Sequence, residues 1–222
     1  VTMDGASHLE WLRTRRSLRR FTSQPVEREV LERLFQAAIT APSATNRQPW
    51  RFAAVSAPAM RATIVDAVRQ RTTEMKAVIA NSHHAEDFGS YGDFFFEPIE
   101  SAQVIVIPQY REYPDLIAQL IASGGGDPAT YDTASAMQAE LCSTSAAIMC
   151  LLLQANAEGL GACWMAGPMV ARRDVEKVLG ITAPWRMVGA IAIGWPETPP
   201  ADRPGRKPID KVVTWHEGAA HE

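Results

Sequence analysis

Cysteine is scarce in this 222-residue sequence, which contains only Cys142, Cys150 and Cys163. Cys142 and Cys150 lie on one predicted helix, about 12 Å apart at 1.5 Å per residue, which is too far for a disulfide. Free thiols in apolar surroundings are typical of a reducing compartment. The sequence also starts without a basic segment followed by an apolar run, so we expect no secretion and a cytoplasmic protein.

The patterns of several enzyme classes are missing as well. The five histidines show no HExxH or similar spacing, so we expect no metal site. There is no P-loop, and neither sign of charge dominates, because 22 basic and 25 acidic side chains leave a net charge of −3. This balance argues against nucleic acid or an anionic membrane as the main partner.

The stretch Ala134–Glu158 contains good helix formers without Gly or Pro, and it carries no charge after Glu140 until its last residue. We predict a central helix that Gly159 stops in the left-handed conformation. Polar residues such as Ser143 and Gln154 make it a poor membrane span. Because it is apolar on most faces, it must be buried on several sides, by its own chain or also by a second subunit.

The rest of the chain shows no internal repeat and no dividing linker, so we expect one domain over residues 1–222. The predicted helices are His8–Arg15, Val26–Thr40, Pro58–Ala80 and Arg172–Leu179. The predicted strands are Trp50–Val55, Gln103–Ile107 (stopped by Pro108), Ala162–Met165 and Met187–Ile193. We expect Asn81–Glu97 to be irregular and Tyr110–Tyr131 to contain a turn or mobile loop.

Arg15, Ser17 and Arg19 alternate in a segment that we predict to be extended, so their side chains face one side. Two guanidinium groups and a hydroxyl suit a phosphate dianion, because Arg forms bidentate, charge-assisted hydrogen bonds. A solvated basic patch is the alternative explanation.

Two loops carry further patterns. Between Pro42 and Trp50, the side chains of Ser43, Asn46 and Gln48 could bind the amide-like edge of a heterocycle, although an ordinary polar turn explains them equally well. The segment 159–167 falls short of the GxGxxG dinucleotide fingerprint, because Trp164 replaces the third Gly and the segment follows a helix. It predicts a helix stop and a tight turn.

Together these segments resemble the nitroreductase family of flavin enzymes. Residues 15–21 (RRSLRRF) are similar to its N-terminal phosphate motif, residues 41–50 to its APSxxNxQPW loop, and residues 159–164 to its GLGxxW turn. The C-terminal pattern of the family is similar to Gly194-Trp195-Pro196, Arg206-Lys207-Pro208, Val212, Val213 and Trp215. The middle of the chain carries no diagnostic motif.

The resemblance implies an α+β fold with a mixed central sheet flanked by helices, built as an intertwined homodimer around the long buried helix. Two FMN molecules would lie between the subunits, with Arg15, Ser17 and Arg206 at the phosphate and Arg19 at the pyrimidine edge of the ring. The partner subunit would supply the loop around Asn46. The implied cofactor-binding set is Arg15, Arg16, Ser17, Arg19, Pro42, Ser43, Ala44, Asn46, Gln48, Lys76, Met165, Ala166, Gly167 and Arg206.

Within that set, the backbone of Ala166 and Gly167 would approach flavin N5, and Lys76 would lie on the O2 side of the ring. Family members often have a Lys two residues before the C-terminal Arg, where this chain has Pro204. Either Arg203 substitutes for that Lys or the phosphate has one cation fewer.

The implied activity is the FMN-dependent oxidation of NAD(P)H with reduction of nitroaromatics, quinones or similar flat acceptors by a ping-pong mechanism. Flavin N5 carries the hydride, so no catalytic side chain is assigned, and Arg19 would stabilise the reduced ring. The alternatives are a reductive dehalogenase, a flavin-fragmenting enzyme, a flavin protein without turnover, and a protein that binds a phosphorylated ligand or an acidic protein without flavin.

The variable segment 81–133 is expected to cover the open face of the flavin and to set acceptor choice. The aromatic residues with which it could do so are Tyr91, Phe94, Phe95, Phe96, Tyr110, Tyr113 and Tyr131. Core packing is the alternative explanation and the favoured one for Phe94–Phe96, because consecutive side chains cannot all face one pocket.

Overall fold

The structure is a computed structural model that describes residues 4–83, 91–133, 136–198 and 205–216. Its centre is a five-stranded sheet with strand order β1-β2-β5-β3, in which β4 also pairs with β2. The strands are β1 (Trp50–Val55), β2 (Val104–Arg111), β3 (Gly161–Met165), β4 (Trp185–Met187) and β5 (Ala190–Gly194). These strands pair antiparallel, and a parallel bridge joins Ser17 to Ala162. Helices around an antiparallel sheet confirm the α+β class.

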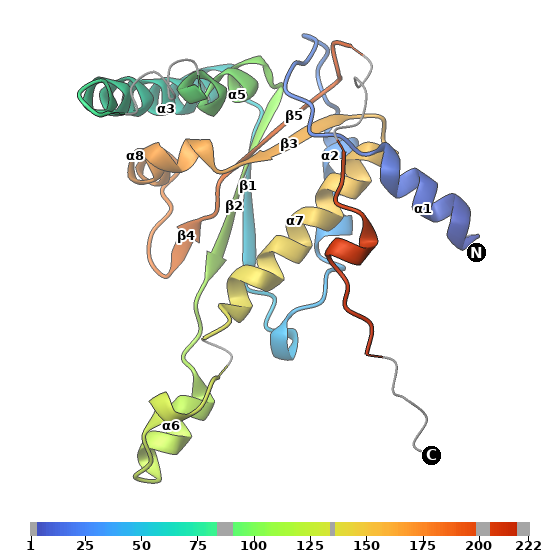
Figure 1. The fold of residues 1–222 in the computed structure, drawn as a ribbon. Coiled ribbons are helices and arrows are strands. Elements are labelled where there is room, and N and C mark those ends of the chain that lie inside the picture. The colour runs from blue at the N-terminus through green and yellow to red at the C-terminus, as the bar shows by residue number, and fades with distance from the viewer. Residues whose placement is uncertain (1–3, 84–90, 134–135, 199–204, 217–222) are drawn as a thin grey trace.

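The helices cover both faces of this sheet (Figure 1). The α-helices are α1 (Gly5–Thr14), α2 (Arg28–Ala38), α3 (Pro58–Ile79), α5 (Glu97–Ser101), α6 (Leu116–Ser123), α7 (Ala139–Ala157) and α8 (Arg172–Val178). Short 3-10 helices are η1 (Ala44–Asn46), η2 (Tyr91–Phe95), η3 (Pro128–Thr130), η4 (Gly167–Ala171) and η5 (Ile209–Lys211). None of the described helices is both long and apolar enough to cross a membrane.

Strand β2 divides the apolar core into two layers, because successive side chains of a strand point to opposite faces. Ile105 and Ile107 pack with side chains of α3, α5 and α8 on one face. Val104 and Val106 pack with α2 and α7 on the other. The fully buried strand explains why its sequence is a continuous apolar run rather than an alternating one.

Helix α7 is the predicted central helix, although it begins later than expected. Its N-cap residue, Gln138, has a left-handed backbone with φ 52°, which ends the helix on that side. Residues 134 and 135 lie outside the described part of the chain. At the other end Gly159 has φ 77°, the N–H of Leu160 donates to the carbonyl of Ala155 at 2.9 Å, and that of Gly159 donates to Asn156 at 3.2 Å. These bonds form the predicted glycine stop.

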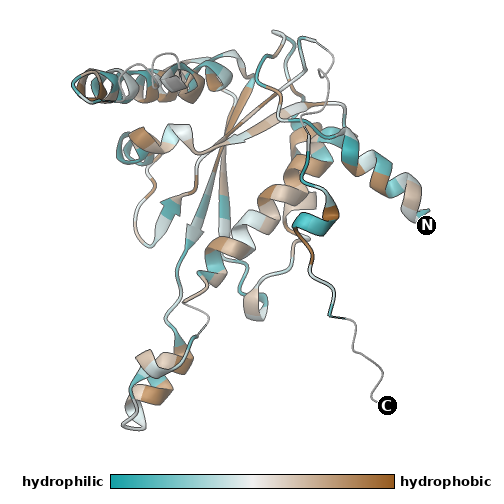
Figure 2. Ribbon diagram, viewed as in Figure 1, coloured by the Kyte–Doolittle hydropathy of each residue, from teal (hydrophilic) through white to brown (hydrophobic). Residues whose placement is uncertain are grey.

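One stripe of α7 is left uncovered by the described residues of its own chain. Cys142 and Met149 are exposed, and Ser145, Ala146 and Leu153 on the same helix face are only half-buried. Met149 retains 41% of its accessible surface. Figure 2 shows how apolar this helix is over most of its length. An apolar stripe on an otherwise buried helix is suited to contact with another protein surface.

Two strand predictions were wrong in their limits. Strand β2 continues past Pro108 to Arg111. The proline lies opposite the gap between β4 and β5, so no ladder hydrogen bond needs its missing N–H. Its carbonyl still accepts a bond from the N–H of Val188 at 2.9 Å. The predicted strand 187–193 is divided at Gly189, which has φ 107°. A Cβ atom there would lie 2.5 Å from the carbonyl oxygen of Met165.

The middle of the chain is more regular than its sequence indicated. Residues 91–101 form η2 and α5, and residues 110–131 contain the end of β2, α6 and η3. Helix α6 projects away from the sheet in Figure 1. Three of its side chains, Leu116, Ile117 and Leu120, each retain more than half of their accessible surface. His84 and Gly89, which we included in the irregular segment, lie outside the described residues.

Candidate cofactor site

A cavity of about 460 Å³ lies at the end of β3. Its lining residues come from the N-terminal segment, η2, β3 and the start of η4: Arg19, Phe94, Phe95, Cys163, Trp164, Met165, Ala166 and Gly167. Four of these, Arg19 and residues 165–167, belong to the predicted cofactor-binding set. The structure therefore brings together parts of the chain that are about 150 residues apart in sequence.

The N-terminal segment lies along the edge of β3. Leu18 donates its N–H to the carbonyl of Ala162 at 3.1 Å, next to the parallel bridge of Ser17. Gly161 makes this approach possible, because a Cβ atom there would lie 3.0 Å from the ring of Phe21 and 3.1 Å from Leu18 Cβ. The pairing gives this segment the extended conformation that our alternation argument requires.

The wall formed by η2 depends on a second glycine. A Cβ atom at Gly167 would lie 2.5 Å from Cδ1 of Phe95, so only glycine allows η2 and η4 to meet this closely. Phe95 is half-buried and packs against the core, whereas Phe94 is 52% exposed at the cavity. Phe96 instead packs under the guanidinium of Arg69, 5.0 Å from its ring centroid. Packing thus accounts for two of the three consecutive phenylalanines.

Two arginines place positive charge near Cys163: Arg19, which lines this cavity, and Arg15, which lines a separate, smaller one. Cys163 is 2% exposed, and burial raises the pKa of its thiol, while the nearby charges of Arg19 and Arg15 oppose that rise. The thiol is therefore neutral at physiological pH and is not an ionised nucleophile. Because both guanidinium groups act on this one buried atom, an anionic ligand would be favoured beside it.

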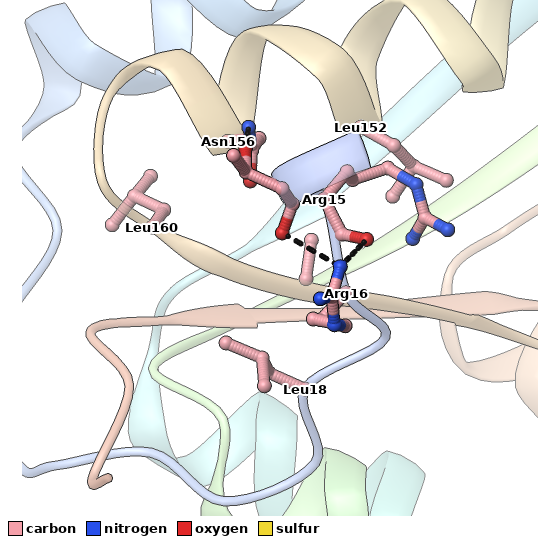
Figure 3. Close-up of a pocket in the computed structure, with 8 residues that line it drawn as sticks. Arg15, Arg16, Leu18, Leu152, Asn156 and Leu160 are labelled. Carbon is pink, nitrogen blue, oxygen red and sulfur yellow. Dashed lines mark hydrogen bonds between the residues drawn. The ribbon is translucent and has the colours of Figure 1, made fainter. Parts of the chain in front are cut away.

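Arg16, also a member of the predicted set, has a different environment. Its Nη1 donates to the carbonyls of Arg13, Thr14 and Arg15 at 2.6, 3.1 and 3.1 Å, which caps the C-terminal end of α1. Its Nε is buried without a hydrogen-bond partner among the described residues. Arg16 and Asn156 line a small cavity of about 30 Å³, which is large enough for one water molecule. Figure 3 shows Arg15 and Arg16 together at this small cavity, with dashed lines for two of the bonds that Arg16 donates.

Lys76 forms an ion pair with η2, which is part of the same wall. Its Nζ lies 2.6 Å from Oδ1 of Asp93, and both side chains are partly buried. Asp93 immediately precedes Phe94 in η2, so the ion pair ties the wall of the cavity to α3. Arg206 is exposed in the described part of the C-terminal segment, whereas Arg203 and Pro204 lie outside it.

The predicted loop residues are not at this cavity in the same chain. Ala44 donates its N–H to the hydroxyl of Ser143 near the start of α7, at 3.2 Å. The N-terminal segment instead contacts the end of α7, where Asn156 donates to Thr14 at 2.9 Å. Ser143 and Asn156 are about 20 Å apart along the helix axis at 1.5 Å per residue. Pro42, Ser43, Ala44, Asn46 and Gln48 therefore lie near the opposite end of the helix.

Comparison with known proteins assigns the family. The Nitroreductase family model matches residues 12–195, which include β1 to β5 and the cavity. The chain belongs to the nitroreductase family. A NADH dehydrogenase of Thermus thermophilus is 30% identical over 205 residues, covering 90% of this chain and 92% of that protein. A 5,6-dimethylbenzimidazole synthase of Rhodospirillum rubrum is 29% identical over 182 residues, covering 82% and 78%.

Solved structures share the fold of this nitroreductase-family chain. A BluB-like flavoprotein of Clostridium difficile 630 has a TM-score of 0.84 at 23% identity and covers 97% of this chain and 100% of its own. An iodotyrosine deiodinase bound to FMN and 3-iodo-L-tyrosine has a TM-score of 0.70 at 19% identity, with coverages of 95% and 98%. At these identities the structures establish the fold and not the reaction.

The sequence motifs did not identify several of the residues that line the cavity. Cys163 was not in our predicted set, although it lies two residues before Met165 on β3 and therefore on the same strand face. The contact between Phe95 and Gly167 had no signal in the sequence, because the two residues are distant in the chain. Among the described residues, no three His, Cys, Asp or Glu side chains gather as a metal site.

Proposed function

We propose that this nitroreductase-family protein is an FMN-dependent oxidoreductase that uses NAD(P)H to reduce flat acceptors such as nitroaromatics and quinones. The observation that carries the proposal is the cavity of about 460 Å³ beside Arg19 at the end of β3. Ligand pockets typically have volumes of roughly 300–1,000 Å³ and combine apolar walls with a few polar groups. Phe94, Phe95 and Met165 provide the apolar wall here.

The residues present fit FMN. Arg15 and Ser17 would hold its phosphate together with Arg206, because guanidinium groups and a hydroxyl form charge-assisted hydrogen bonds with a dianion. The backbone of Ala166 and Gly167 would line the ring. When bound, FMN supplies the redox chemistry by accepting two electrons from NAD(P)H and passing them to the acceptor. Arg19 would favour that step, since its fixed positive charge stabilises negative charge on the ring.

The complete site would need two copies of the chain, as a homodimer. The loop residues Pro42–Gln48 lie near the start of α7, and the N-terminal segment lies near its end. Two copies that pack antiparallel along the uncovered stripe of α7 would bring the loop of each copy to the cavity of the other. The stripe itself, which includes Met149 at 41% exposure, would then be buried.

A second candidate function is the oxygen-dependent fragmentation of reduced FMN. It is favoured by the similarity to two 5,6-dimethylbenzimidazole synthases, each 29% identical, and by the TM-score of 0.84 with the BluB-like flavoprotein. In this function the same cavity would hold reduced FMN as the substrate rather than as a permanent cofactor. The residues that hold the phosphate and ring would be unchanged.

One set of measurements separates these functions. Apo protein is titrated with FMN, and the complex is then given NADH or NADPH anaerobically, followed by a quinone or a nitroaromatic. The proposed oxidoreductase bleaches with the nucleotide, regains its colour with the acceptor and keeps its flavin. A fragmenting enzyme instead loses flavin when reduced FMN meets oxygen and forms a benzimidazole that mass spectrometry detects. Absence of FMN binding would contradict both proposals.

A further inference from the structure

The loop that precedes β1 has an unusual backbone. Thr45, Asn46 and Gln48 adopt the left-handed conformation, with φ values of 50°, 54° and 48°. This region is disfavoured for residues with a Cβ atom and most strongly for a β-branched residue such as Thr45. Conformations of this kind persist only where the surrounding structure holds them, and they occur frequently at functional sites.

Most neutral hydrogen bonds of the loop join its own residues. The N–H of Gln48 donates to the hydroxyl of Ser43 at 3.0 Å, and its side-chain amide donates to Asn46 at 3.2 Å. Two neutral bonds reach outside the loop: the N–H of Ala44 donates to the hydroxyl of Ser143 of α7 at 3.2 Å, and the hydroxyl of Tyr113 donates to the carbonyl of Arg47 at 3.5 Å. The bonds of Gln48 lie within the loop itself, so they cannot fix its position on the rest of the molecule.

A charged contact anchors the loop more firmly to α7. Nη1 of Arg47 donates to Oε1 of Glu140 at 3.2 Å, and their side chains are 31% and 11% exposed. Glu140 lies in the first turn of α7, where the helix dipole favours a carboxylate. The ring of Tyr113 packs against the Arg47 guanidinium, 5.3 Å from its centroid. Such a sheltered pair is costly to break, because each remaining charge loses its partner.

We propose that Glu140 is the positioning residue for this loop: through Arg47 it holds residues 43–48 in the strained shape in which they contact FMN of the partner subunit. The inference rests on the proposed function, since that function makes the loop part of a cofactor site. A loop that is fixed in advance binds with less loss of conformational entropy. Without the ion pair, the left-handed residues relax toward ordinary conformations, and the contacts are lost.

The test compares Glu140→Gln with Glu112→Gln. Both glutamates line the same cavity of about 290 Å³, but Glu112 is exposed and pairs with Arg186 at 3.2 Å. Hydrogen–deuterium exchange of apo protein reports the loop, and a fluorescence titration reports FMN affinity. Glu140→Gln is expected to speed exchange in a peptide over residues 43–48 but not over β1, and to weaken FMN binding roughly tenfold. Glu112→Gln is expected to match the wild type in both measurements.

Arg47→Met is the second variant, and it tests the same pair from the loop side if Glu140→Gln folds poorly. It is expected to reproduce both effects, and the double variant should be no worse than either single one, because all three lack the same interaction. Unchanged exchange over residues 43–48 would overturn the positioning role, and so would faster exchange with wild-type FMN affinity. A wild-type protein that binds no FMN would contradict the proposed function, while the exchange result still decides whether Glu140 holds the loop.

Discussion

Arg15 and Arg16 are adjacent in the chain but have different partners. Arg16 caps α1 through three main-chain carbonyls, whereas the charge of Arg15 acts on the thiol of Cys163, which lines the cavity. We expect Arg15→Ala to weaken FMN binding about tenfold or more, since a charge-assisted hydrogen bond contributes roughly 1.5–3 kcal/mol. Riboflavin, which lacks the phosphate, should bind the wild type and Arg15→Ala with the same affinity.

Arg16→Met is the matched control for this comparison. Because it removes the cap of α1 rather than a phosphate contact, it should lower the melting temperature and affect FMN and riboflavin equally. Parallel fluorescence titrations with the two flavins decide the matter. If Arg15→Ala retained the FMN preference of the wild type, the assignment of Arg15 to the phosphate would be wrong.

The strain at Thr45 has its own consequence. Asn tolerates the left-handed conformation better than a β-branched residue does, so Thr45→Asn should stabilise the protein by on the order of 1 kcal/mol. The same substitution at Thr130, whose backbone is not left-handed, should not increase stability in this way. Thermal unfolding measures both. A Thr45→Asn variant that melts at or below the wild-type temperature would show that this backbone is not strained.

Between elements, the contact of α2 with the end of α7 includes an ion pair whose effect depends on pH. Arg33 donates to Glu158 at 2.7 and 2.8 Å, and this hydrogen bonding lowers the pKa of Glu158 from its ordinary 4.5 to about 2. The carboxylate therefore stabilises the fold above pH 4.5, and this contribution is lost as the pH falls toward 2.

Glu158→Gln removes that contribution, so the variant should lose less stability than the wild type between pH 4.5 and 2. Urea unfolding across this range is the measurement, with the free energy of unfolding compared at each pH. Parallel pH profiles for the two proteins would mean that the pair does not differ between the folded and unfolded states.

The uncovered stripe of α7 predicts the effect of a buried charge. Ala146 lies half-buried in the middle of the stripe. Ala146→Glu should prevent dimerisation or folding, because an unpaired carboxylate would be buried in the interface. Ala62→Glu, on the exposed side of α3, is the control and should remain dimeric. Sedimentation velocity at micromolar concentration would reject the shared helix if the wild type were a stable folded monomer.

Local patterns predicted most elements, because helix and strand periodicity depends on neighbouring residues. Strand β1 and the glycine stop of α7 are as expected. The limits of β2 and the division at Gly189 depend on which strands lie opposite, and one strand's sequence does not contain that information. The same holds at the site. Alternation predicted that Arg15 and Arg19 face one side, and in the structure they line two different cavities. The pairing of Lys76 with Asp93 joins α3 to η2 and had no local signal.

At the scale of the whole molecule, one chain separates the two halves of the predicted cofactor set. The N-terminal segment contacts the end of α7 and contributes Arg19 to the cavity at the end of β3, whereas the loop with its Arg47–Glu140 pair lies near the start of α7. The family assignment and the cavity support the proposed FMN site, and the separation is the reason for proposing that two copies build it. The central claim is therefore that each FMN is bound by both subunits.

Mixed dimers test this claim most directly. One chain carries Arg15→Ala and the other carries Ser43→Ala with Asn46→Ala, and differently tagged subunits allow the mixed species to be purified. Each homodimer should bind FMN weakly at both sites. The mixed dimer should recover one tight site per dimer in an FMN titration, because one of its two FMN sites combines an intact N-terminal segment with an intact loop. If the mixed dimer recovers no tight site, FMN is bound within single chains and the account of a shared site is wrong.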